Sequence, residues 1–322
     1  MVKYAHFPLD VCGGRIMRAI RPTVRALLCW ALLSLSTAAG IAQDLSPRFY
    51  WPAPKGTKVV LIGFSYVSGG VLMDPSLPLY GVDSRTSTGF FAYMQTLSFL
   101  GRTTNAVVEL PYSWGTTEGF VFGKAAQRDF SGLNDLGITL AVNLLGAPSM
   151  TPAEFQELRA NPRPILGASI KVLAPTGHYD EDRLINVGAN RWAFRPELGF
   201  VIPLRPRWLL ELETGAWFFG DDDKYLPGTR EQKPIFAAEV HLVRRFKPGF
   251  WASLEANYFI GGQQTIGGNQ LVDVQRNARI GGTLVVPFRG RHAIKVGYSN
   301  ALFTEFGNDF RQFLVSYIVV FR

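Results

Sequence analysis

The sequence has little cysteine and no long apolar segment in its main part. Its two cysteines are Cys12 and Cys29, both close to the N-terminus. The rest of the chain therefore cannot form disulfides, thiolate metal sites or cysteine nucleophiles. Downstream of residue 45 no apolar run reaches the roughly 18 residues that a transmembrane helix needs. Mean hydropathy is close to zero, at +0.09, which is typical of a large β protein.

The N-terminus has the features of a targeting segment. A stretch rich in arginine precedes the apolar run Ala26–Ala39, and small residues at the end of that run form a cleavage site. We expect residues 1–42 to be a signal peptide that is removed. Met17 begins a more ordinary signal peptide, so residues 1–16 are interpreted as a mis-annotated start. Residues 1–42 hold five basic residues and one acidic residue, so the net charge of +8 falls to +4 without them. Export and this modest charge argue against a nucleic-acid partner.

From Val59 onward the sequence repeats one pattern, an apolar-alternating run followed by a connection. Twelve such runs occur, at residues 59–68, 87–100, 104–114, 133–145, 165–174, 192–204, 207–219, 234–246, 250–260, 276–288, 292–302 and 310–321. Alternation with a period of two predicts strands with one face toward lipid and the other toward a polar interior. Tight turns follow the second, sixth, eighth and tenth runs, whereas the odd-numbered runs are followed by longer connections.

These features predict an all-β fold, a transmembrane antiparallel up-and-down β-barrel of about twelve strands with short periplasmic turns and longer extracellular loops. We expect the barrel to span residues 58–322, after an N-terminal periplasmic segment at residues 43–57. Thr151–Asn161 is the one helical-looking stretch, because Thr151 can cap a helix with Glu154 three residues on. That helix is expected on the periplasmic side.

The last run predicts how the barrel closes. Five side chains on its outward face are apolar: Phe313, Val315, Tyr317, Val319 and Phe321. An exposed apolar edge strand is an aggregation hazard, so we predict that this run pairs with the first run, Val59–Ser68. The run also resembles the C-terminal signal that the barrel-assembly machinery recognises, although Arg322 follows the aromatic residue.

Three stretches resemble a family of outer-membrane transporters named after the meta pathway of phenol degradation. They are Gly132–Leu140 (GLNDLGITL), Lys171–Asp180 (KVLAPTGHYD) and Asn186–Phe200 (NVGANRWAFRPELGF). The likeness extends over roughly residues 59–322. The resemblance implies a β-barrel and uptake of hydrophobic or aromatic compounds, and it assigns no functional residues.

The inward faces of the predicted strands collect ionisable side chains. These candidate lumen-lining residues are Glu109, Lys171, Arg195, Glu197, Glu211, Glu213, Glu239, His241, Glu255, Arg279 and Lys295. We expect an acidic sector around Glu211, Glu239 and Glu255, followed by a basic sector at Arg279 and Lys295. Two interpretations stay open: a transverse field that selects solutes in a pathway, and a paired network that plugs a narrow lumen.

Aromatic and acidic residues near the strand ends suggest surface features. Two interfacial girdles are expected, from Tyr112, Trp114, Trp192, Trp217, Phe218 and Tyr258 at one end and Trp208, Phe250, Trp251, Phe288 and Phe321 at the other. A ligand-stacking role for Trp217 is the alternative. The runs 180–182 and 221–223 are interpreted as solvated loop charges rather than cation ligands.

No catalytic, cofactor or metal motif is found. His241 with Ser253 is the nearest approach to a Ser–His pair, and we interpret His241 as part of a charge network. We predict a channel in the outer membrane of a Gram-negative bacterium, not an enzyme, for small hydrophobic or aromatic compounds. Its expected partners are outer-membrane lipid, lipopolysaccharide, the barrel-assembly machinery and a small-molecule substrate. The alternatives are a non-conducting surface barrel and a soluble exported protein of lipocalin type.

Overall fold

The computed structural model describes residues 47–72, 79–121, 123–183, 186–225 and 228–321. The predicted signal peptide, residues 1–42, lies outside the described residues, as does Arg322. Within the described ranges, no helix is long and apolar enough to cross a membrane.

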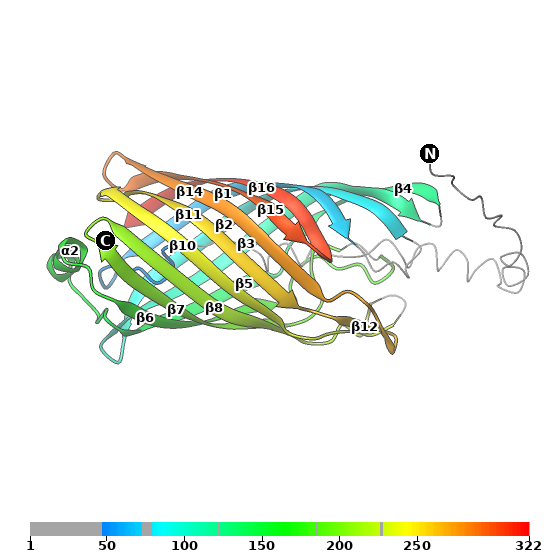
Figure 1. Cartoon of the computed structure of the whole chain (residues 1–322), viewed down its shortest axis with the longest axis horizontal. Helices are drawn as coiled ribbons and strands as arrows, with labels where there is room; N and C mark the ends of the chain where they lie inside the picture. The colour runs from blue at the N-terminus through cyan, green and yellow to red at the C-terminus, as the bar shows by residue number, and fades with distance from the viewer. Residues whose placement is uncertain (1–46, 73–78, 122, 184–185, 226–227, 322) are drawn as a thin grey trace, which may run out of the picture.

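Most of the described chain forms one closed antiparallel β-barrel (Figure 1). Its sheet has 13 strands, and because β4 and β5 lie end to end beside β3, the wall has twelve positions. The strands are β1 (Lys58–Leu72), β2 (Leu79–Phe99), β3 (Arg102–Val121), β4 (Lys124–Leu133), β5 (Leu136–Leu145), β6 (Ile165–Ala174), β7 (Ala193–Arg205), β8 (Trp208–Phe219), β10 (Ile235–Lys247), β11 (Phe250–Gly261), β14 (Gln275–Phe288), β15 (His292–Thr304) and β16 (Gly307–Phe321). β1 pairs with β16 from Lys58↔Phe321 to Leu72↔Gly307, which confirms the predicted closure.

The two faces of each strand differ as the alternation predicts. On β11, Leu254 is 68% exposed on the outer face, whereas Ser253 and Glu255 on the inner face are buried. On β16, Phe313 and Tyr317 are exposed and Ser316 is buried. A belt of exposed apolar side chains around a polar interior is the arrangement that a bilayer requires of a spanning barrel.

Tight turns connect the strands at the end where β1 begins and β16 ends. Leu100 and Gly101 join β2 to β3 with φ values of 49° and 73°, and Arg289 and Gly290 follow β14 with 45° and 72°. Positive φ at two successive residues gives the turn twist that matches paired strands, and glycine adopts it without strain. We take this end as periplasmic, because short turns mark that side of outer-membrane barrels.

At the opposite end, three connections that the sequence suggests are long loops are largely strand. β1 and β2 extend to Leu72 and Leu79, β3 and β4 to Val121 and Lys124, and β15 and β16 are separated by two residues. These three connections are shorter than predicted, whereas the connections after β6, β8 and β11 are long, as predicted. Serine and threonine side chains form hydrogen bonds between neighbouring strands of these polar extensions. Ser84 Oγ on β2, for example, lies 3.0 Å from Thr117 Oγ1 on β3. Such cross-strand pairs stabilise the strand pairing in the extensions. The barrel wall formed by β2 to β4 therefore extends farther along the barrel axis, away from α2, than the rest of the wall (Figure 1).

An irregularity separates β4 from β5. Tyr112 of β3 pairs with Leu133 and Glu109 pairs with Gly137, so two residues of β3 face three residues of the other chain segment. This bulge lies opposite Pro111, which has no N–H to donate, and the N–H of Asn134 bonds to the Pro111 carbonyl at 3.0 Å. The bulge turns Asp135 inward.

Short elements cover the two ends. Helix α2 (Pro152–Ala160) lies at the periplasmic end, and its N-terminus has the capping box of Thr151 and Glu154. At the other end, β9 (Arg230–Gln232), β12 (Gln264–Ile266) and β13 (Asn269–Gln270) form a small three-stranded sheet.

Candidate pathway through the barrel lumen

The eleven candidate lumen-lining residues divide by burial. Seven are buried: Arg195, Glu211, Glu213, Glu239, His241, Glu255 and Arg279. Glu109, Lys171, Glu197 and Lys295 are half-buried and line a cavity inside the barrel. Burial in a wall whose apolar outer face is exposed means that these side chains point inward.

Three neighbouring strands bring five of these groups into one cluster. The guanidinium of Arg195 on β7 donates to Glu239 on β10 and forms ion pairs at 2.5 Å with both Glu239 and Glu197. Register places Glu213 directly opposite Glu239, and Nε2 of His241 lies 3.9 Å from a carboxylate oxygen of each. We call Arg195, Glu197, Glu213, Glu239 and His241 the lumenal cluster.

The expected basic sector does not form. Arg279 pairs in register with Ala301, whereas Lys295 pairs with Val285, six positions along β14. At about 3.3 Å per residue they are roughly 20 Å apart along the strands. Arg279 donates to Ser299 Oγ at 2.6 Å and lies over the Phe310 ring, while Lys295 lines the same cavity as Glu213 and Glu239. The prediction missed this separation because it ignored the stagger between strands.

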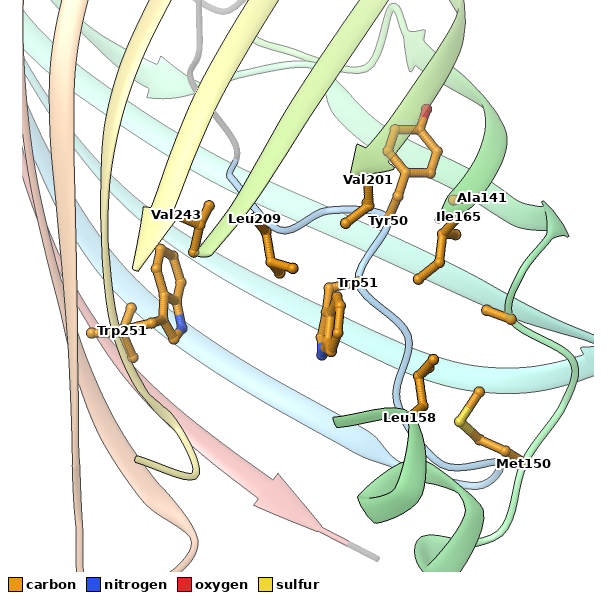
Figure 2. Packing of buried hydrophobic residues seen from close by; sticks show 12 residues of the cluster. Tyr50, Trp51, Ala141, Met150, Leu158, Ile165, Val201, Leu209, Val243 and Trp251 are labelled. Atoms are coloured by element: carbon orange, nitrogen blue, oxygen red, sulfur yellow. The ribbon is translucent and has the colours of Figure 1, made fainter. Parts of the chain in front are cut away.

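The N-terminal segment Pro47–Trp51, which we call the plug, lies inside the barrel at its periplasmic end (Figure 2). The N–H of Arg48 donates to Glu211 Oε2 at 2.6 Å. The hydroxyl of Tyr50 donates to Glu197 Oε1 at 2.9 Å and lies 2.9 Å from Ser169 Oγ. Predicting this stretch simply as a periplasmic segment missed these contacts, because its partners come from strands more than 100 residues away.

Two glycines make room for the Tyr50 ring. Gly167 of β6 and Gly199 of β7 are register partners, and both face inward. A Cβ at either position would lie within 2.2 Å of the Tyr50 ring. The ring therefore lies flat against bare backbone of two strands, a position that no larger residue at 167 or 199 would permit.

Apolar side chains surround the plug. Tyr50 and Trp51 pack with inward residues of the strand ends and with Leu158 of α2, as Figure 2 shows for Val201, Leu209, Val243 and Trp251. The guanidinium groups of Arg48 and Arg245 lie 5.5 Å and 4.9 Å from the Trp51 ring. A small hydrophobic core therefore fills the periplasmic end of the lumen on the side formed by β5 to β14.

Two of the expected girdle residues belong to this interior. Trp251 is only 9% exposed and lies in the core around the plug. Trp217 is 1% exposed, stacks on Phe219 and lines the lumenal cavity. Their assignment to the girdles is wrong, because both occupy inward positions of their strands. Exposed aromatics such as Trp114 and Tyr258 remain on the outer face.

Above the plug, two adjoining cavities lie in the part of the lumen that the structure describes. The lower cavity has a volume of about 270 Å³ and is bounded by Pro47, Phe49 and part of the lumenal cluster. The upper cavity, of about 190 Å³, lies toward the extracellular side. Phe90, Glu109, Lys171 and Leu314 line both, so these four residues form the boundary between them.

That boundary contains an ion pair that crosses a strand. Glu109 Oε2 on β3 lies 2.6 Å from Lys171 Nζ on β6, although β5 lies between these strands. Gly137 of β5 faces inward beneath the pair, and a Cβ there would lie 3.1 Å from the Glu109 carboxylate. Glycine at this position leaves the space through which the two side chains meet.

The three stretches that carry the family resemblance meet at one point near the upper cavity. Asp135 accepts hydrogen bonds from the N–H groups of Gly177 at 2.9 Å and Ala189 at 2.8 Å. A Cβ on Gly177 would lie 2.7 Å from the Cα of Gly188, and a Cβ on Gly188 would lie 2.8 Å from the Cα of Gly177, so neither residue could carry a side chain. The bulge therefore holds Gly177 and Ala189, in the connection between β6 and β7, against the inner wall.

The acidic runs are only partly solvated. Asp222 is fully buried and accepts from the Tyr179 hydroxyl at 3.0 Å and from Asn190 Nδ2 at 2.8 Å, so its interpretation as a solvated charge is wrong. Asp221 and Asp223 are exposed as expected. Asp222 therefore links Tyr179 and Asn190, which lie between β6 and β7, to the segment after β8.

Ser253 and His241 do not form a catalytic pair. The Ser253 hydroxyl donates to Glu255 Oε1 at 2.5 Å. Neither ring nitrogen of His241 has a hydrogen-bond partner among the described residues.

A closed barrel with an apolar belt, short turns at one end and an internal cavity defines an outer-membrane channel fold, found in Gram-negative bacteria. The family model described as "Putative MetA-pathway of phenol degradation" matches residues 57–305, and the chain belongs to that family.

The chain is similar to several solved structures, and the match with a TM-score above 0.5 shows the same fold. The COG4313 outer membrane channel from Pseudomonas putida F1 is similar with a TM-score of 0.71 and 19% identity, over 86% of this chain and 100% of that one. The β domain of the Bordetella autotransporter BrkA has a TM-score of 0.49 and 14% identity, over 83% and 100%. The translocator domain of the autotransporter NalP from Neisseria meningitidis has 0.47 and 12%, over 93% and 94%. No curated protein matches the chain.

Proposed function

We propose that this barrel lets small hydrophobic or aromatic molecules cross the outer membrane through its lumen. The observation that carries the proposal is the pair of adjoining cavities above the plug, bounded by Phe90, Glu109, Lys171 and Leu314. The family description, which names phenol degradation, supports the choice of aromatic compounds.

The upper cavity suits a ring with one or two polar groups. Its volume of about 190 Å³ exceeds the roughly 150 Å³ of an apolar protein cavity that binds benzene. Phe310 and Leu314 provide apolar contacts, and Ser65 and Thr86 provide hydroxyls. Such a mixture of apolar and hydroxyl groups can hold a phenol-like molecule.

We assign the inward charges to this pathway. The lumenal cluster and the Glu109–Lys171 pair place opposite charges across the lower cavity and its upper boundary. A field across a constriction orients polar solutes and excludes ions of the wrong sign. The plug narrows the periplasmic mouth, so passage requires the plug to move or a route past it.

The plug also favours a second candidate function, a closed barrel that acts through its extracellular surface. Tyr50 is 2% exposed, and its contacts with β6 and β7 occupy the periplasmic part of the lumen. A non-conducting barrel needs no mobile plug.

Planar-bilayer recordings with the mature protein separate the two functions. The channel proposal predicts brief openings of the wild type and longer openings of Tyr50→Ala, because the substitution removes the ring and both hydroxyl contacts. Release of an aromatic substrate such as phenol from proteoliposomes should increase in the same order, while release of a disaccharide should not. Silence of both proteins with no phenol flux would overturn the channel and support the closed barrel.

We further propose that residues 1–42 direct export and that β16 provides the assembly signal. The alternation of Phe313, Val315, Tyr317, Val319 and Phe321 supports recognition by the barrel-assembly machinery, and the exposed polar wall of β2–β4 suits contact with lipopolysaccharide. N-terminal sequencing of the mature protein and membrane fractionation of Phe321→Ala test these points. Cleavage elsewhere, or normal assembly of the variant, would contradict them.

A further inference from the structure

Three buried side chains in the lumen place potential metal ligands close together. One ligand atom each from Glu213, Glu239 and His241 lies within 4.8 Å of the others, and all three residues are buried. Glu213 is on β8, and Glu239 and His241 are alternate residues of β10. Register sets Glu213 opposite Glu239, so all three side chains point to the same face of the sheet.

His241 is the group that points to a ligand. Its side chain is 0% exposed, and neither ring nitrogen has a hydrogen-bond partner in the described parts of the chain. Nε2 lies 3.9 Å from an oxygen of each carboxylate, too far for a hydrogen bond. A buried imidazole without partners is costly, and a cation between the three groups would satisfy its Nε2.

The charges around His241 favour a cation. Two carboxylates directly opposite each other in a sheet repel. Arg195 is bound to Oε1 of Glu239 at 2.5 Å, whereas Oε2 of the same carboxylate faces His241. Arg195 thus holds Glu239 in the way that outer groups orient metal ligands.

We propose that Glu213, Glu239 and His241 bind one divalent transition-metal ion, with Zn²⁺ as the representative case. One imidazole and two carboxylates form a common ligand set for such ions, at about 2.0–2.2 Å from the metal. Tetrahedral binding at those lengths separates ligand atoms by roughly 3.3–3.6 Å. The three ligand atoms lie within 4.8 Å of one another, so side-chain rotations that move them by about 1 Å would bring them to that separation.

The site is open on one side. Glu213 and Glu239 line the lower cavity of about 270 Å³, which gives the ion an entry path and leaves a coordination position for water or a lumenal solute. A bound ion would cross-link β8 and β10 and reduce the negative charge of the pathway. Sequence spacing gives no signal for this site. Glu239 and His241 follow Glu213 by 26 and 28 residues, and only the strand register brings them together.

Isothermal titration of the chelator-treated, folded barrel with ZnCl2 in detergent tests the proposal. We expect one ion per chain in the wild type and affinity at least about tenfold weaker in Glu213→Gln and His241→Asn. Glu109→Gln is the matched control, because it removes one negative charge from the lumen and leaves the three ligands in place. It should bind as the wild type does.

Co²⁺ provides a second readout on the unmodified protein. The proposal predicts the intense visible absorption of cobalt with four ligands, and its loss when Zn²⁺ is added in excess. Absence of zinc binding by the wild type, or equal binding by Glu213→Gln and Glu109→Gln, would overturn the site. Neither result bears on phenol flux, so the channel proposal is tested separately.

Discussion

Glu109 and Lys171 form a 2.6 Å ion pair that reaches across β5 above Gly137, at the boundary of the two lumenal cavities. Both side chains are part-exposed, so solvent screens the pair. We expect a coupling of about 0.5–1 kcal/mol in the unfolding free energy from a double-mutant cycle of Glu109→Gln and Lys171→Met.

In bilayers, Lys171→Met should increase preference for cations, because Glu109 then faces the cavity alone. The exchanged pair Glu109→Lys with Lys171→Glu is the control and should restore wild-type selectivity. Unchanged selectivity in all variants would place this boundary outside the pathway.

Gly199→Ala should displace the plug although no residue of the plug is substituted. A Cβ at 199 would lie 2.1 Å from the Tyr50 ring, so the ring must leave its position on β7. We expect longer channel openings in planar bilayers, as for Tyr50→Ala. Gly297→Ala is the matched control, since the nearest atom to its added Cβ is 3.6 Å away. Equal behaviour of the two alanine variants would contradict a plug held by Tyr50.

Asp135→Asn should loosen the loop 175–192. The carboxylate accepts two backbone N–H bonds, and hydrogen bonds to a charged group contribute about 1.5–3 kcal/mol each. An amide keeps only one acceptor, so trypsin should cut at exposed Arg183 about tenfold faster or more. Asp182→Asn, an exposed change on the same loop, should not alter the rate. Equal cleavage rates of the two variants would contradict the role of Asp135 in holding this loop.

Leu212→Arg should destabilise the barrel in lipid vesicles. Leu212 is on the outer face of β8, between the inward Glu211 and Glu213, and arginine near the bilayer centre costs about 2–4 kcal/mol. Ala125→Arg, on the exposed extension at β4, should cost at most about 1 kcal/mol. Urea unfolding in vesicles measures both. An unchanged unfolding free energy of Leu212→Arg would mean that the inner and outer faces of β8 are assigned the wrong way round.

Helix α2 should respond to acid through its cap. Hydrogen bonds from the backbone N–H and the hydroxyl of Thr151 lower the pKa of Glu154. A carboxylate with a lowered pKa stabilises the fold above its unfolded value, and that contribution is lost as the pH falls through the folded value. NMR signals of α2 should therefore lose helical shifts in that acidic window. Glu154→Gln keeps a neutral acceptor, so its α2 signals should not change over that window. The same acid response in both proteins would exclude the cap as its cause.

The sequence by itself determined the barrel. Alternation in twelve runs sets the inner and outer faces, because a strand has a period of two and lipid accepts only apolar side chains. Closure of β1 on β16 followed from the same pattern, since a terminal apolar edge needs a partner. The three family stretches were also visible in the sequence. That Asp135 joins them, by hydrogen bonds to Gly177 and Ala189, was not.

Tertiary structure decided what the lumen contains. Tyr50 meets Gly167 and Gly199, and Glu213 meets Glu239 and His241, only because strand register and barrel stagger bring distant positions together. The same stagger separates Arg279 from Lys295. Alternation states which way a side chain points, but not its height in the barrel. Height depends on how far each strand slides along its neighbour, and only the closed sheet fixes that distance.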